Sequence, residues 1–207
     1  MTTIRPFQPG DLDALYDIAL KTGEAGADAT ALYADPRLVG HIYAAPYGVL
    51  EPQSAFVAED GDGVAGYIVG AVDTRAFEAQ TEQDWWPRLR PGYADPVGVS
   101  PDAWTPDQTR AYQIHHPHPA PRRVVTPYPS HLHINLLPRL QGQGIGKRLM
   151  DTWLDAVTEM GSPGAHLGVA ATNARGLRFY RAYGWTELDL GLPNLGSIYF
   201  GMALPRS

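Results

Sequence analysis

The stretch LPRLQGQGIGKRLM, residues 137–150, contains a turn with three glycines, Gly142, Gly144 and Gly146. The residues before the turn, HLHINLL (131–137), alternate between polar and apolar, as expected of a strand with one buried face. The residues after it, 145–160, repeat apolar side chains at helical spacing. The sequence therefore predicts a strand, a glycine-rich turn and an amphipathic helix in direct succession.

A helix that begins beside glycines can offer its first backbone N–H groups to an anion. Those groups have no acceptor inside the helix and carry partial positive charge. Glycines let a ligand approach the backbone closely and adopt positive φ angles at little cost. Lys147 and Arg148 add positive charge directly after the turn. The pattern indicates a phosphate site, and its structural alternative is a tight connection between strand and helix.

The turn fails two common phosphate-binding patterns. In GxxxxGK[ST], Gln141 stands where the first glycine belongs, and Arg148 replaces the Ser or Thr that would hold magnesium. The dinucleotide pattern GxGxxG also fails, because its third glycine would be Lys147 if the pattern began at Gly142 and Leu149 if it began at Gly144. A third pattern, Gln-x-x-Gly-x-Gly, is satisfied by Gln141, Gly144 and Gly146.

Strand and helix signals continue on both sides of this unit. Apolar side chains at helical spacing after Asp11 and after Asn173 predict two helices, the second ending at a Gly184 cap. A further helical stretch is expected at 30–46, ending before Pro46. The predicted strands span 3–8, 54–60, 63–72, 131–137, 165–171 and 197–204.

Between residues 75 and 130 this pattern stops. Residues 87–129 hold 10 of the chain's 19 prolines, and proline cannot occupy the centre of a sheet. The span is too aromatic for an inert linker. We predict an insertion packed over the domain as a substrate cover. Its segment WWPRLRPGY (85–93) is either an aromatic wall for substrate or a set of packing residues.

Length and composition favour a single folded domain spanning 1–207. A net charge of −6 disfavours a nucleic-acid partner, because phosphate backbones repel an acidic chain. No run approaches the ~20 apolar residues that a membrane span needs, and the N-terminal residues lack a signal-peptide core. The absence of cysteine excludes a cysteine-linked acyl intermediate. A soluble, cytoplasmic protein without a membrane partner is expected.

The glycine turn resembles the pyrophosphate loop of the GNAT superfamily of N-acetyltransferases, which bind acetyl-CoA. IRPFQPGDLDAL (4–15) is similar to that family's opening strand and helix, and NARGLRFYRAYGW (173–185) to its second signature. Residues 128–150 and the insertion also resemble bacterial relatives of the acetyltransferase-like C-terminal domain of O-GlcNAcase. The resemblance implies the GNAT fold: α/β (α+β), a central mixed, mostly antiparallel twisted sheet of six to seven strands flanked by helices.

The family resemblance implies acetyl transfer from acetyl-CoA to a primary amine by direct attack in a ternary complex. Strand 131–137 would part from strand 165–171 and leave a notch for the coenzyme. Tyr180 corresponds to the family's general acid, with core packing as its structural alternative, while Asn173 would combine coenzyme contact with helix capping. The implied cofactor-binding residues are Leu136, Gln141, Gly142, Gln143, Gly144, Ile145, Gly146, Lys147 and Asn173.

Two polar side chains, His133 and Asn135, project from the same face of the central strand. His133 titrates in the range of a general base, and a structural histidine is the alternative. Asn135 stands where the O-GlcNAcase-like relatives carry aspartate. An amide cannot accept the proton, so Asn135 is expected to orient the acceptor or a water. His131 lies on the same face, but no histidine spacing matches a zinc motif, and no metal is expected.

The acceptor implied by the resemblance is a small-molecule or peptide amine. The alternative function is a catalytically silent acetyl-CoA- or peptide-binding domain on the same scaffold, because relatives in the O-GlcNAcase-like group can keep the fold without catalysis. Edge strands of the family often pair between subunits, so a homodimer is an open expectation.

Overall fold

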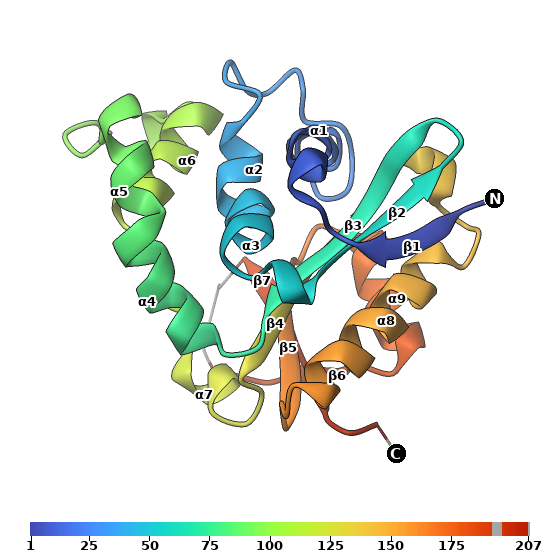
Figure 1. Cartoon of the computed structure of the whole chain (residues 1–207). Helices are drawn as coiled ribbons and strands as arrows, with labels where there is room; N and C mark the ends of the chain where they lie inside the picture. Colours follow the sequence, from blue (N-terminus) through green and yellow to red (C-terminus); the bar gives the residue numbers. More distant parts are fainter. Residues whose placement is uncertain (192–195, 207) are drawn as a thin grey trace.

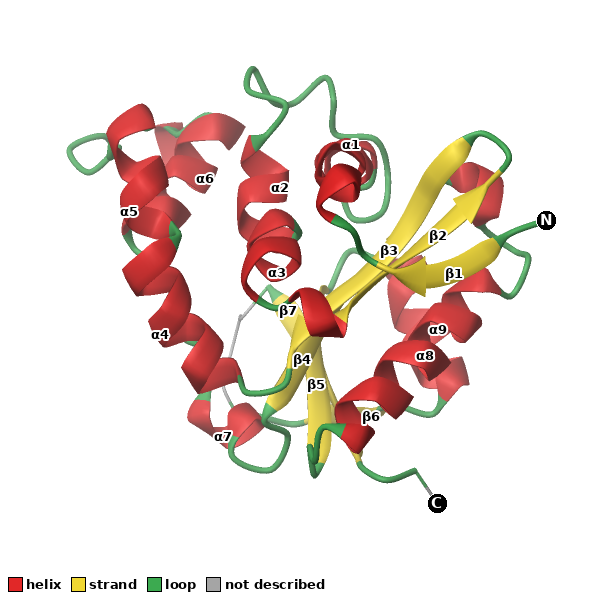
Figure 2. Ribbon diagram, in the orientation of Figure 1, coloured by secondary structure: helices red, strands yellow, loops and turns green. Residues whose placement is uncertain are grey.

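The computed structural model describes residues 1–191 and 196–206, which contain a seven-stranded sheet of order β1-β2-β3-β4-β5-β7-β6. Neighbouring strands are antiparallel except β4 and β5, which run parallel. The sheet is strongly twisted and flanked by helices (Figures 1 and 2), which confirms the predicted fold class. The strands are β1 (Thr3–Pro6), β2 (Ala55–Asp60), β3 (Gly63–Ala71), β4 (Ser130–Leu136), β5 (Gly164–Ala170), β6 (Thr186–Leu188) and β7 (Ser197–Ala203).

Helices pack on both faces of the sheet (Figure 2). On one face, α1 (Leu12–Lys21) and α3 (Ala45–Leu50) contact β3, and on the other α8 (Ile145–Glu159) contacts β2, β3 and β4. Beside α8 lies α9 (Ala174–Tyr183), whose Tyr183 hydroxyl donates to Asp151 at 2.6 Å. The remaining helices are α2 (Leu38–Tyr43), α4 (Thr74–Asp84), α5 (Trp86–Leu89), α6 (Pro106–His115) and α7 (Arg122–Val125). No helix of the described chain is long and apolar enough to cross a membrane.

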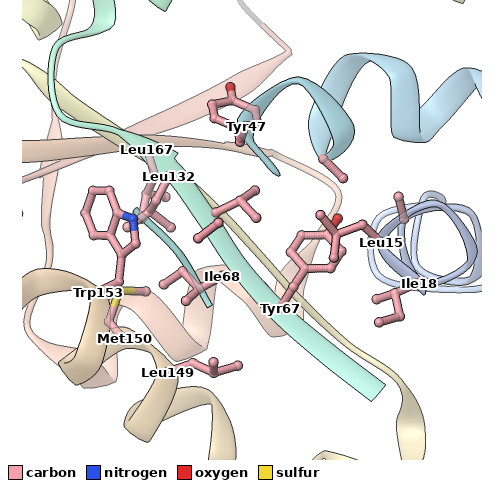
Figure 3. Close-up of a cluster of buried hydrophobic side chains, with 14 of the residues drawn as sticks. Leu15, Ile18, Tyr47, Tyr67, Ile68, Leu132, Leu149, Met150, Trp153 and Leu167 are labelled. Carbon is pink, nitrogen blue, oxygen red and sulfur yellow. The ribbon is translucent and has the colours of Figure 1, made fainter. Parts of the chain in front are cut away.

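Strand β3 divides the hydrophobic core into two halves (Figure 3). Ile68 points toward α8, whereas Tyr67 points toward α1. The indole of Trp153 on α8 is fully buried. Gly70 makes room for it, since a Cβ there would lie 2.5 Å from the Trp153 ring and 2.2 Å from the His131 carbonyl oxygen. The apolar stripe predicted for residues 145–160 is therefore the buried face of α8.

The two parallel strands at the centre of the sheet separate soon after they meet. β4 pairs with β5 only through Ser130 and His131, although β4 continues to Leu136 and β5 to Ala170. The predicted parting of these strands is confirmed. It leaves one backbone edge of β4 facing an opening instead of a partner strand.

The predicted helix at 30–46 is wrong in part. Residues 30–37 form turns, in which the carboxylates of Asp28 and Asp35 accept the N–H groups of Thr30 and Arg37, each at 2.8 Å. Such local hydrogen bonds compete with a helix. The first helix begins only at Leu38 and ends before the predicted boundary at Pro46. A second helix begins at Ala45, because Pro46 is tolerated in its first turn.

The span 75–130 packs over the domain, as predicted, and it contains four α-helices. Several of its prolines stand in the first turns of helices, where the missing N–H costs nothing. Helices α4, α5 and α6 pack on α2 and α3, outside the sheet (Figure 1). Trp85 donates its indole N–H to the His41 carbonyl at 2.9 Å, and Trp86 is buried in the same cluster. The tryptophan pair therefore packs the insertion onto the domain.

Candidate active site

A cleft of about 660 Å³ opens where β4 and β5 part. Its walls come from the glycine turn, β4, β5, α9 and the connection after α1, with Tyr43 of α2 and Arg110 of α6 at one end. It brings together ten of the predicted residues: His133, Asn135, Leu136, Gln141, Gly142, Gly144, Gly146, Lys147, Asn173 and Tyr180. The side chain of Gln143 instead donates to the Arg139 carbonyl at 2.6 Å, and that of Ile145 is buried in the core. Gln143 and Ile145 could therefore contact a ligand in the cleft only through their backbone N–H groups.

The N-terminus of α8 presents its backbone donors to this cleft. The first N–H with an acceptor is that of Arg148, which donates to the Gly144 carbonyl at 3.1 Å. In the described chain, the N–H groups of residues 142–147 have no such acceptor. Gly142 and Gly144 have φ angles of 73° and 75°, which side chains rarely adopt. At Gly146 a Cβ would make only ordinary contact, 3.5 Å from the Phe179 ring, so packing alone does not require glycine there.

The positive charges near this helix end differ from those expected. Lys147 lines the cleft but pairs with Asp151 at 2.8 Å. Arg148 lies away from the cleft, with Nη1 donating to the Thr2 carbonyl at 3.3 Å, so its expected place beside the phosphate is wrong. Arg175 of α9 does line the cleft and donates to the Gln141 side chain. No sequence pattern pointed to Arg175, because its place depends on how α9 packs beside the turn.

The open edge of β4 carries backbone groups free for a ligand. Leu137 donates its N–H to the Ala65 carbonyl of the neighbouring chain segment at 2.8 Å. Hydrogen-bonded pairs alternate along an antiparallel ladder, so the backbone groups of Ile134 and Leu136 point to the other side, into the gap. The Leu136 carbonyl accepts from the Gln141 amide at 2.8 Å. This contact ties the glycine turn to the end of β4.

Tyr180 lines the cleft from α9 and is 9% exposed. Its ring packs 5.7 Å from the ring of Phe200, measured between centroids. Its hydroxyl has no hydrogen-bond partner among the described residues. Burial raises the pKa of Tyr180 above that of free tyrosine, so the phenol is protonated at neutral pH. Packing and an available proton donor therefore coexist in one residue.

A chain of hydrogen bonds fixes which nitrogen of His133 carries hydrogen. The Thr74 hydroxyl donates to the Pro129 carbonyl at 2.6 Å, so its oxygen accepts from Nδ1 of His131 at 2.8 Å. Nε2 of His131 then accepts from the Tyr47 hydroxyl at 2.9 Å. The Tyr47 oxygen in turn accepts from Nε2 of His133 at 3.2 Å. His133 therefore has hydrogen on Nε2 and a lone pair on Nδ1.

This polarity suits His133 to accept a proton. Each donor in the chain points away from His133, so the negative end of the Tyr47 dipole faces the imidazole and would stabilise positive charge on it. Burial, together with His166, lowers the pKa of His133 to about 4 and keeps the free imidazole neutral. Among the described residues, no three His, Asp or Glu side chains are grouped to hold a metal ion.

The two asparagines are oriented by neighbours. The Thr22 hydroxyl donates to the Ile18 carbonyl at 2.7 Å, so its oxygen accepts from the amide NH₂ of Asn135. Asn135 Oδ1 is left as an acceptor at the cleft. Asn173 accepts from the Gly176 N–H at 2.8 Å and caps α9, as predicted, while also lining the cleft.

These features define the class of protein. A twisted mixed sheet whose parallel strands part beside a free helix N-terminus is a scaffold for a phosphate-bearing ligand. Residues 111–185 match the model of the acetyltransferase (GNAT) family. The crystal structure of SsHAT is 36% identical, with a TM-score of 0.88 over 98% of both chains. The chain belongs to the GNAT acetyltransferase family.

Two further relatives extend the comparison. Protein O-GlcNAcase of Rattus norvegicus is 26% identical over 188 residues, which make up 90% of this chain and 20% of that protein. The chain thus spans about a fifth of the length of the curated relatives it matches. The structure of yncA from Salmonella typhimurium with its cofactor acetyl-CoA shares the fold at 18% identity, with a TM-score of 0.53 over 100% of this chain and 95% of that one.

Proposed function

We propose that this protein is an acetyl-CoA-dependent N-acetyltransferase. The observation that carries the proposal is the cleft between β4 and β5, which ends at the unpaired N–H groups of residues 142–147. Family membership and the acetyl-CoA-bound yncA structure support the same donor. Acetyl-CoA supplies an activated acetyl thioester when bound. The backbone of the turn would hold its pyrophosphate, and that of Leu136 would pair with its pantetheine arm.

Two side chains are suited to move protons during the transfer. His133 would accept a proton from the amine at Nδ1, the nitrogen that its hydrogen bond to Tyr47 leaves free. Tyr180 would donate its hydroxyl proton to the leaving group. Asn135 would orient the amine through Oδ1, because its NH₂ is held by Thr22. These roles require the amine to enter from the end of the cleft lined by Tyr43 and Arg110.

The proposal is tested by calorimetric titration with acetyl-CoA, followed by acetylation assays on a panel of amines. Coenzyme A and an adenosine fragment without pantetheine serve as ligand controls. Micromolar or tighter binding of acetyl-CoA, with turnover of at least one amine, is the expected result. Binding without turnover of any amine would favour the catalytically silent binding domain, and no binding at millimolar ligand would overturn both functions.

A further inference from the structure

One end of the cleft contains a partly buried cation without an anionic partner. Arg110 of α6 donates from Nε to the Tyr33 hydroxyl and from Nη1 to the Tyr43 hydroxyl, both at 3.0 Å, and also from Nη1 to Gln113 at 2.8 Å. All three acceptors are neutral. Within residues 1–191 and 196–206, no carboxylate lies within 4 Å of this guanidinium. Seven other arginines of the described chain have acidic partners, among them Arg90 with Glu82, whereas six, such as Arg148, do not.

Two N–H groups of Arg110 remain for a ligand. A guanidinium carries five N–H donors, and the contacts above use the one on Nε and the two on Nη1. The pair on Nη2 has no acceptor among the described residues. A partly buried cation with neutral partners is costly to maintain, and an anion in the cleft would offset that cost.

Arg110 lies near His133, the proposed proton acceptor of the acetyl transfer. Its Cζ lies 5.2 Å from the centroid of the Tyr43 ring, and the His133 ring lies 5.5 Å from the same centroid. The guanidinium and the imidazole are therefore at most about 11 Å apart, and both lie beside the same aromatic ring. A small amine that carries a carboxylate a few bonds from its nitrogen can span such a distance. Its carboxylate would contact Arg110 while its nitrogen faces His133 Nδ1.

A second unpaired group lies in the same cleft. The Tyr67 hydroxyl is buried and has no hydrogen-bond partner, although Tyr67 lines the cleft beside β4. Buried hydroxyls are usually satisfied, so this one is available to a bound polar ligand. The other basic residues of the lining, Lys147 and Arg175, belong to the glycine-turn end. The Arg110 end thus offers one cation, which suits a carboxylate with one negative charge better than a phosphate.

We propose that Arg110 binds the carboxylate of the acceptor, so that the acceptors of this protein are amino acids or closely related amino carboxylates. The inference rests on the proposed function, since it assigns the amine that His133 would deprotonate. It narrows the expected acceptor from any amine to amines with an anionic group. It also gives the insertion a direct role, because Arg110 is the one residue of 75–130 among the cleft's described lining.

The test compares each of a set of amino acids with its decarboxylated amine and its carboxamide, using kcat/KM of the wild-type protein. Amino acids are expected to be roughly 10- to 100-fold better, the worth of a charge-assisted contact. Arg110→Gln should remove that preference by raising KM, while Arg110→Lys should keep part of it. The acetyl-CoA affinity and melting temperature of each variant control for folding.

A binding arm separates this inference from the proposed function. N-acetyl amino acids and N-acetyl amines are titrated into the wild-type protein and Arg110→Gln in the presence of coenzyme A. A preference for the carboxylate that depends on Arg110 supports the subsite even if no amine is acetylated. Turnover of amines without a carboxylate preference overturns the subsite and leaves the proposed function intact. Because the wild-type comparison needs no variant, it decides the question even if Arg110→Gln fails to fold.

Discussion

Replacing Gly144 by aspartate is expected to abolish most acetyl-CoA binding through charge, and the matched replacement by asparagine isolates that charge. The φ angle of Gly144 is 75°, a region that asparagine and aspartate tolerate better than other side chains. A Cβ at this position would meet no atom within 4 Å, so neither side chain clashes with the protein. Both variants should lose a similar ~1–2 kcal/mol of stability from the backbone conformation.

The difference between the two variants can be estimated from Coulomb's law. Two unit charges 4 Å apart repel by ~1 kcal/mol in water and by ~4 kcal/mol at the effective dielectric of a protein surface. The aspartate variant should therefore bind acetyl-CoA roughly 5- to 800-fold more weakly than the asparagine variant. The gap should narrow at high ionic strength, because salt screens exposed charges.

The assay is calorimetric titration of wild type, Gly144→Asp and Gly144→Asn with acetyl-CoA at low and high salt, with thermal melting of each protein. Equal affinities for the two variants, at equal melting temperatures, would refute the reasoning, because no phosphate could then lie beside residue 144.

Three further predictions follow from the site. Tyr180→Phe should keep acetyl-CoA affinity, since the ring packing is unchanged, but should lower kcat by ~10²-fold or more; an unchanged kcat removes Tyr180 as the acid. Tyr47→Phe should retain the stacking on Phe77 but leave Nε2 of His131 and Nε2 of His133 without a partner, which costs ~1–3 kcal/mol of stability. The pH profile of kcat should change as well, and an unshifted profile would contradict the hydrogen-bond chain from Thr74 to His133. Burial lowers the pKa values of His131, His133 and His166. The unfolded state therefore binds more protons than the folded state between about pH 6.5 and 4. As a result, the free energy of unfolding falls as the pH drops through that window. His133 contributes on the order of 1–2 kcal/mol of that loss by pH 5; equal urea midpoints at pH 7 and 5 would contradict it.

The features that the sequence predicted well are local ones. The glycine turn, the Asn173 cap and the Gly184 cap each depend on residues a few positions apart. The strand at 131–137 and the helix at 145–160 follow from periodicity within one segment. The helix at 30–46 failed because side-chain hydrogen bonds hold its first residues in turns, which periodicity does not register.

The sequence by itself determined the position of the glycine turn, because that turn depends on a pattern within one short segment, and it indicated the fold class through motifs that resemble those of the GNAT family. Only the tertiary structure decided that Nδ1 of His133 is the free nitrogen, since Tyr47 lies 86 residues away along the chain. The same holds for Arg110, whose contacts to Tyr33 and Tyr43 join residues 77 and 67 positions apart. Such contacts leave no periodic signal, because they depend on how α2, α3 and the insertion pack together over the sheet.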